Sequence, residues 1–289
     1  PILFSTLLAE GEHVFHNIPR LKDIDSTAEL LKALGCETWW KGGVFHVKVN
    51  RAPALEAHYD IVRKMRASIL CLGPLLTKYG QAVVSMPGGC AIGTRPIDLH
   101  LDGMSALGAE IALQEGYVKA HIGNSSKKLK CATILFEVST VGGTENLMMA
   151  AALAEGTTIL ENAAKEPEII DLAEYLNKMG AKIRGQGTSV ITIEGVEFLK
   201  PAEHIIMPDR IEAGTLLIAG AITGGEVTVE KIKPQLVEAL IKKMHEAGFR
   251  ISETENSVTI HSCRQWQGVD ITTAPYPLFP TDLQAQFMA

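Results

Sequence analysis

The chain has 289 residues, of which 46% are hydrophobic and 21% are charged, as in a globular protein of about two domains of roughly 100 to 200 residues each. Its formal net charge of -6 argues against nonspecific attraction to nucleic acid or to a membrane surface. No charge-free apolar run of about 18 residues or more suggests a membrane span, and nothing resembles a secretory leader. We therefore expect a cytoplasmic protein.

The cysteines indicate neither disulfides nor zinc. They are odd in number and widely scattered, and no two form a C-x-x-C pair: Cys36, Cys71, Cys90, Cys131 and Cys263. We expect reduced thiols, no metal and no cofactor.

Four segments share one pattern, which predicts a repeated unit recurring at roughly 70 residues. Each has a small-residue helix, a strand led by glycine, a second helix that ends just before another glycine, and a strand pair. The leading glycines are Gly11, Gly80, Gly156 and Gly225, and the closing ones, suited to a left-handed residue after a helix, are Gly35, Gly108, Gly180 and Gly248.

The third repeat shows the periods most clearly. Pro167 opens an amphipathic helix to Met179, and residues 181–184 and 190–193 form a hairpin with one buried face. Residues 144–153 and 212–221, with small residues on several sides, predict helices packed inside a domain. Another helix is predicted from about Tyr59 to Lys78.

Both ends look cut, so a complete protein is expected to be longer. A proline-flanked connection near residues 201–208 predicts a boundary between a domain of residues 1–204 and a partial second domain of residues 205–289.

Residues 87–96, Pro-Gly-Gly-Cys-Ala-Ile-Gly-Thr-Arg-Pro, form the most distinctive segment. Glycines let backbone N–H groups surround an anion, and Arg95 would stabilise a thiolate of Cys90 or a bound anion. A phosphate loop of nucleotide hydrolases is disfavoured because its lysine is absent. An ordinary glycine turn with an incidental cysteine is the remaining alternative.

The residues after this loop leave their roles open. Arg95 and Asp98 could bind a ligand, or the segment could be a solvated turn in which Asp98 only caps a helix. His100, between two leucines, is expected to be a partly buried histidine without a catalytic role. Arg66 could point into a cleft or belong to a solvated face.

A second unusual segment is the proline-rich run 274–284. Three prolines in six residues fix an extended lead-in, and Thr281 or Asp282 could cap the next helix. Three prolines give more rigidity than a cap requires, so the Asp282 carboxylate is also a candidate general base.

The Cys90 segment together with residues 97–100, the segment 154–169 and the end 279–287 closely resemble the UDP-N-acetylglucosamine 1-carboxyvinyltransferases, a family of bacterial enolpyruvyl transferases. The resemblance runs from Pro1 to Ala289. It implies an α/β (α+β) fold of repeated β-α-β-α-β-β units in two inside-out globular domains, with the substrates in the cleft between them.

The resemblance also implies the reaction: the enolpyruvyl group of phosphoenolpyruvate passes to the 3-hydroxyl of UDP-N-acetylglucosamine, and phosphate leaves. Cys90 matches the proton donor, the thiol that fosfomycin alkylates, and Asp282 matches the residue assigned to the sugar hydroxyl. Arg95 would bind phosphate, Pro96, Ile97, Asp98 and Leu99 would line the uridine pocket, and Arg66 would hold the nucleotide sugar.

The chain departs from the family in two respects. A Lys-Asn pair and the late arginines that contact phosphoenolpyruvate lie outside this sequence. Some members carry a lysine in the region 138–146, which has none here; Thr140, Val141 and Gly142 are still expected to contact substrate. The alternatives are a noncatalytic UDP-sugar-binding paralogue or fragment, and the shikimate-pathway transferase, which lacks the Cys90 loop. The oligomeric state stays open.

Overall fold

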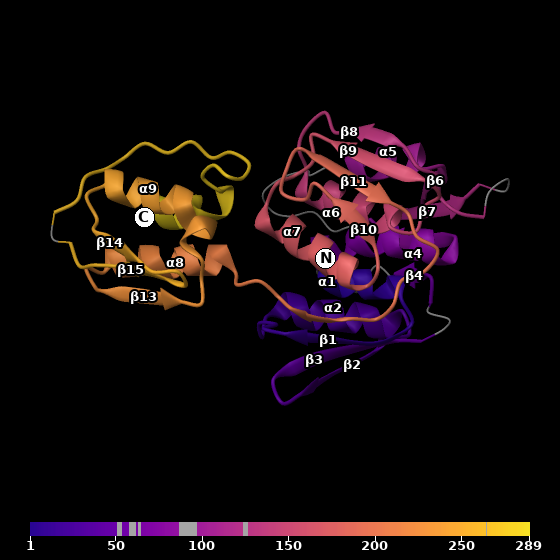
Figure 1. Ribbon diagram of the computed structural model, residues 1–289, viewed down its shortest axis with the longest axis horizontal. Coiled ribbons are helices and arrows are strands. Elements are labelled where there is room, and N and C mark those ends of the chain that lie inside the picture. Colours follow the sequence, from indigo (N-terminus) through magenta and orange to yellow (C-terminus); the bar gives the residue numbers. More distant parts are fainter. Residues whose placement is uncertain (51–53, 58–61, 63–64, 87–96, 124–126, 264) are drawn as a thin grey trace. The chain divides into compact units, whose positions relative to one another are not determined.

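The computed structural model describes residues 1–50, 54–57, 62, 65–86, 97–123, 127–263 and 265–289. It divides into two compact units, Pro1–Ile206 and Met207–Ala289, each with its own hydrophobic core. Figure 1 labels their helices and strands.

The order of the elements repeats. The first repeat has α1 (Ile2–Ser5), η1 (Thr6–Leu8), β1 (Gly11–His16), α2 (Lys22–Ala33), β2 (Glu37–Lys41) and β3 (Val44–Val49). The second has β4 (Glu56–Ala57), η2 (Arg66–Cys71), α4 (Leu72–Tyr79), β5 (Gln81–Ser85), α5 (Asp98–Ala106), β6 (Ala109–Gln114) and β7 (Tyr117–Ile122). The third has β8 (Thr133–Leu135), α6 (Val141–Ala151), β9 (Thr157–Glu161), α7 (Pro167–Lys178), β10 (Lys182–Arg184) and β11 (Val190–Glu194).

The fourth repeat has β12 (Glu203–Ile205), α8 (Arg210–Ile222), β13 (Val227–Glu230), η3 (Pro234–Val237), α9 (Glu238–Glu246), β14 (Ile251–Glu253) and β15 (Ser257–Ile260). The short η4 (Thr281–Leu283) and α10 (Gln284–Met288) follow. The predicted β-α-β-α-β-β order is confirmed.

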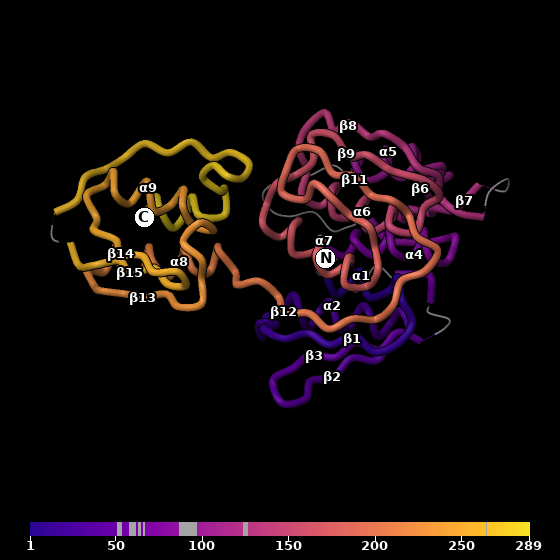
Figure 2. Tube along the Cα trace, in the orientation of Figure 1, coloured from indigo at the N-terminus to yellow at the C-terminus, as the bar shows by residue number. Residues whose placement is uncertain are grey.

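Each repeat forms one small sheet, except that one strand of the fourth repeat belongs to the sheet of the first. The strand orders are β4-β5-β7-β6, β8-β9-β11-β10, β12-β1-β3-β2 and β13-β15-β14. Strand β12 opens the fourth repeat in the sequence, yet it pairs in parallel with β1, as Figure 2 shows. The sheet of the first repeat is therefore completed by a strand from the last residues of the first unit.

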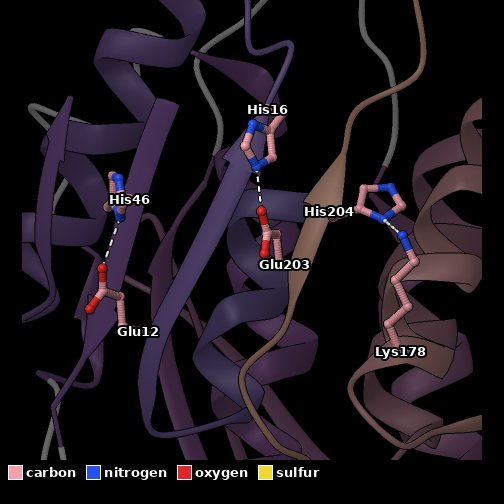
Figure 3. Close-up of polar contacts among 6 residues, drawn as sticks. All are labelled: Glu12, His16, His46, Lys178, Glu203 and His204. Carbon is pink, nitrogen blue, oxygen red and sulfur yellow. Dashed lines mark hydrogen bonds and ion pairs between the residues drawn. The ribbon is translucent and has the colours of Figure 1, made fainter. Parts of the chain in front are cut away.

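Polar contacts fix β12 on both of its sides. His16 Nε2 lies 2.5 Å from Glu203 Oε1, and Lys178 Nζ of α7 lies 3.0 Å from His204 Nδ1; Figure 3 draws both contacts. The other ring nitrogen of His204 lies 2.9 Å from Asp171 Oδ1. Because the lysine can only donate to Nδ1, the buried imidazole carries its proton on Nε2 and donates to the carboxylate.

The helices lie inside, as predicted from their small residues. In α6 every side chain from Gly143 to Ala151 is buried, whereas strands such as β9 alternate buried and more exposed positions. All four predicted glycines after the second helices have positive φ, between 91° and 107°, the left-handed conformation that glycine adopts without steric cost. Their prediction is confirmed.

The single helix predicted from about Tyr59 to Lys78 is wrong. Met65 is extended, with φ -146° and ψ 121°, and a 3-10 turn, η2, precedes α4 at Leu72. Pro74 explains the late start, since a proline has no N–H and fits an α-helix only in its first turn.

Candidate functional site

Several residues of the first unit are predicted to contact substrate. Those that lie within the described part of the chain are found at the starts of three helical segments. Arg66 begins η2, Asp98 begins α5, and Thr140 precedes α6. Helix α6 packs against η2, α4 and α5. The fold therefore brings together segments that are far apart in the sequence.

The first turn of α6 carries Val141 and Gly142 and is capped by Thr140. The Thr140 hydroxyl accepts a hydrogen bond from Gly143 N at 3.2 Å, and its carbonyl accepts one from the Thr144 hydroxyl at 2.7 Å. The N–H groups of a first turn point out of a helix and, with the helix dipole, favour an anion. This end of α6 is suited to a phosphate group.

The start of α5 contradicts the prediction that Asp98 caps this helix. The residue before the helix is Ile97, which is buried, and no side chain caps α5. Asp98 is the first helical residue and is exposed, so the interpretation of Asp98 as a cap is wrong. Leu99 is half-buried. The Asp98 carboxylate is thus on the surface beside the favourable end of the helix dipole.

Two buried polar residues of α6 were not identified from the sequence. Asn146 is 0% exposed and lies 3.0 Å, through Nδ2, from Nδ1 of the buried His100. Glu145 is 5% exposed. Burial is the main cause that raises the pKa of its carboxyl from 4.5 to about 7; the positive N-terminus opposes this rise, and the carboxylates of Glu168 and Glu166 contribute to it. Their only sequence signal is a Glu-Asn pair within a run of small and apolar residues. His100, expected to be partly buried and satisfied, has the expected polar contact but is more deeply buried than predicted, with 5% of its surface exposed.

Asp282 belongs to the second unit, in η4, which follows Pro280. Its carboxylate is exposed and caps neither η4 nor α10, so the capping alternative is wrong. The neighbouring Leu283 is 2% exposed, and the Asp282 carbonyl accepts a hydrogen bond from Gln286 Nε2 at 2.9 Å. Backbone and hydrophobic anchors therefore hold this residue while its carboxylate faces solvent.

The proline-rich lead-in is also anchored. Phe279 is buried, its carbonyl accepts from Ala274 N at 3.0 Å, and the guanidinium of Arg210 lies 5.6 Å from the ring centre of Tyr276. The peptide bond between Tyr276 and Pro277 is cis. These contacts account for the rigidity expected of this segment.

Cys90, Arg95 and Pro96 lie outside the described residues. Of the four cysteines that are described, none forms a disulfide. Burial raises the pKa of Cys36 and of Cys71 to about 12, which makes both poor nucleophiles at neutral pH. Cys131 is exposed and Cys263 is half-buried.

Within the part of the chain that the structure describes, no group of three or more His, Cys, Asp or Glu residues is arranged to hold a metal ion. Among the same residues, no helix has the length and apolar character needed to cross a bilayer.

Comparison with known proteins identifies the family. The model of EPSP synthase (3-phosphoshikimate 1-carboxyvinyltransferase) matches residues 1–289. A UDP-N-acetylglucosamine 1-carboxyvinyltransferase of Bdellovibrio bacteriovorus is 71% identical over 289 residues, which are 100% of this chain and 69% of that protein. The Geobacter metallireducens protein of the same name is 53% identical, over 100% of this chain and 68% of its own length.

Solved structures agree on the fold. The enolpyruvyl transferase NikO from Streptomyces tendae matches with a TM-score of 0.82 at 20% identity, over 96% of this chain and 66% of that one. An EPSP synthase from Acinetobacter baumannii matches with a TM-score of 0.67 at 19% identity, over 93% of this chain and 64% of that one. The chain thus spans about two thirds of the length of the proteins it matches. It belongs to the enolpyruvyl transferase family that the EPSP synthase model describes.

Proposed function

We propose that this protein transfers the enolpyruvyl group of phosphoenolpyruvate to the 3-hydroxyl of UDP-N-acetylglucosamine and releases phosphate, the first committed step of peptidoglycan precursor synthesis. One observation carries the proposal: 71% identity along the whole chain to a UDP-N-acetylglucosamine 1-carboxyvinyltransferase. The likeness to EPSP synthase structures, at 19% identity, supports a common fold and not a common acceptor. The substrates are small molecules, and the reaction belongs to the cytoplasm.

The chemistry needs a proton for the methylene carbon of phosphoenolpyruvate, a base for the sugar hydroxyl, and positive charge for phosphate and carboxylate. Cys90 is the proposed proton donor and Arg95 the proposed phosphate ligand. Asp282 is the proposed base; its exposed carboxylate on an anchored turn is free to approach a substrate hydroxyl. No cofactor or metal is required for these steps.

The nucleotide sugar is assigned to the helix starts of the first unit. Arg66, the Pro96–Leu99 segment and the Thr140–Gly142 segment are the proposed contacts. The capped first turn of α6 supports a phosphate there, because N–H groups and the helix dipole favour an anion.

A phosphate-release assay tests the activity. Because the chain spans 69% of its 71% identical relative, the assay uses the complete gene product with phosphoenolpyruvate. We expect phosphate release that requires UDP-N-acetylglucosamine and is absent with 3-phosphoshikimate. Release with 3-phosphoshikimate instead would identify the shikimate-pathway alternative. Tight binding of UDP-N-acetylglucosamine without turnover would identify the noncatalytic paralogue.

A further inference from the structure

Gln286 connects the segment that carries Asp282 to helix α8. Its amide nitrogen, Nε2, lies 2.9 Å from the Asp282 carbonyl and 3.0 Å from Oγ1 of Thr215 in α8. The Thr215 hydroxyl in turn donates to the carbonyl of Ile211, in the first turn of the same helix, at 2.8 Å. A chain of three hydrogen bonds therefore runs from the backbone of Asp282 to the beginning of α8.

The chemistry of these groups fixes the direction of each hydrogen bond. The carbonyls of Asp282 and Ile211 can only accept. The Thr215 hydroxyl uses its one proton on Ile211, so its oxygen accepts from Gln286. Nε2 carries two protons, and one goes to each acceptor. A flipped Gln286 amide would set its oxygen against the Asp282 carbonyl, where two acceptors would repel each other.

An apolar contact joins the same two elements. Leu283, the residue after Asp282, is 2% exposed. It lies against Gly214 of α8, where a Cβ would be only 2.8 Å from Leu283 Cδ1, so the missing side chain makes room for the leucine. Gly214 and Thr215 are thus neighbouring positions of α8, one of which accommodates Leu283 while the other binds Gln286.

These contacts act on the backbone and leave the Asp282 carboxylate exposed. In the proposed reaction this carboxylate takes the proton of a sugar hydroxyl, and a base must lie within hydrogen-bond reach of the proton that it takes. A displacement of about 1 Å can lower a rate by about 10²-fold. Hydrogen bonds constrain a backbone closely, because they weaken steeply away from the favoured angle. The contacts of Gln286 therefore bear on the rate of proton transfer.

We propose that Gln286 is a positioning residue for the Asp282 base. It ties the backbone of Asp282 to Thr215 and so holds the carboxylate where it meets the hydroxyl of the acceptor. The proposal rests on the proposed function and deepens it, because a positioned base matters only where a hydroxyl proton is removed.

Hydrogen exchange of the complete gene product tests the anchor without turnover. In Gln286→Met, which keeps the length of the side chain but has no donor, the amides of residues 281–288 should exchange about fivefold faster than in the wild type. Gln284→Met is the matched control, since Gln284 is an exposed glutamine of the same helix, and it should exchange as the wild type does. Equal exchange in the two variants would overturn the proposal, whether or not the protein has the proposed activity.

Turnover then tests the positioning. The kcat of Gln286→Met should fall about tenfold, while the KM for each substrate changes by less than about twofold. In the Asp282→Asn background Gln286→Met should lower kcat no further, because Gln286 acts through the carboxylate that is already absent. An unchanged kcat in the single variant, a loss seen only in KM, or additive losses of kcat in the double variant would each overturn the proposal.

The partner on α8 separates positioning from packing, and it decides the matter if Gln286→Met does not fold. Thr215→Val keeps the shape of the side chain but has no hydroxyl, and its kcat should fall about fivefold. Thr215→Ser loses a methyl group but restores the hydroxyl, and it should recover most of the wild-type kcat. The reverse order, or equal kcat values, would contradict the proposal. If the wild-type protein releases no phosphate, the proposed function fails, and hydrogen exchange still decides the anchor.

Discussion

His13 Nδ1 of β1 and the Tyr175 hydroxyl of α7 lie 2.5 Å apart inside the first unit. The other nitrogen, Nε2, lies 3.0 Å from the Ala9 carbonyl, which can only accept. The ring therefore donates from Nε2 and accepts the Tyr175 proton at Nδ1. Burial lowers the pKa of His13 and raises that of Tyr175, in keeping with a neutral pair.

Tyr175→Phe should destabilise the first unit by about 2 kcal/mol, because it leaves the buried Nδ1 of His13 without its donor. The chain has two units, so global unfolding need not be two-state. Hydrogen exchange of amides in β1 and α7 measures the opening free energy locally. Tyr117→Phe is the control, because Tyr117 of β7 is only half-buried. If both substitutions lower the opening free energy equally, the contact between Tyr175 and His13 does not have the proposed role.

Glu145 should make the first unit less stable as pH rises. Its pKa of about 7 in the folded protein exceeds the ordinary value of 4.5 for a glutamate carboxyl, so the folded state binds the proton more tightly. The resulting stabilisation is complete below 4.5 and is lost as pH rises through 7. Relative to wild type, Glu145→Gln should gain up to about 3 kcal/mol between pH 4 and pH 9.

Thermal melts across this pH range measure the Glu145 effect. Glu174→Gln, on the exposed face of α7, is the matched control and should follow the wild-type profile. A Glu145→Gln profile parallel to the wild type would show that the Glu145 carboxyl does not titrate with folding.

Asp209 caps α8 in the second unit, where its Oδ1 accepts from Ile211 N at 2.8 Å and from Glu212 N at 3.0 Å. Asp209→Ala should lower the stability of this unit by about 1 kcal/mol, while Asp209→Asn, which keeps an acceptor, should lose less. Hydrogen exchange in α8 separates the two outcomes. Equal losses would indicate that the charge at the helix start matters more than the hydrogen bonds.

Much of the fold follows from local sequence patterns, and one pairing does not. Glycines after helices and alternating strands are read within short windows, so the repeat and its hairpins were predicted correctly. The partner of β12 depends on a parallel contact with β1 across nearly the whole first unit. A Cβ on Gly11 would lie 2.9 Å from Pro201 Cγ. The repeat pattern identifies Gly11 as the start of a strand, but nothing near it in the sequence indicates that Pro201 lies against it.

The residues of the candidate site also fall into those that the sequence identified and those that it did not. The segments around Asp98, Thr140 and Asp282 stand out as motifs, and whether they meet substrate remains a prediction. Asn146 and Glu145 could not be identified, because a buried polar role depends on neighbours from other helices. The capping interpretations of Asp98 and Asp282 failed because each helix start is preceded by an apolar residue or proline, Ile97 or Pro280, and the carboxylates stay outside.

The thiols should differ sharply in reactivity. Iodoacetamide at pH 8 should modify the exposed Cys131 and leave Cys36 and Cys71 intact in the folded protein, because burial suppresses their thiolates. Fosfomycin should add to Cys90 alone, as peptide mapping by mass spectrometry would detect. An adduct on another cysteine, or none in the active protein, would remove Cys90 from its proposed role.

Asp282→Asn tests the proposed base. Amide and carboxylate have nearly the same shape, and the carboxylate is exposed and caps no helix, so folding should be unchanged. If Asp282 takes the proton of the sugar hydroxyl, kcat should fall by about 10² to 10⁴ while the KM for UDP-N-acetylglucosamine changes little. Asp270→Asn, also exposed in the second unit, is the control and should keep the wild-type kcat. If the kcat of Asp282→Asn lies within about twofold of the control, Asp282 is not the general base of the reaction. The loss of a general base lowers kcat by more than that.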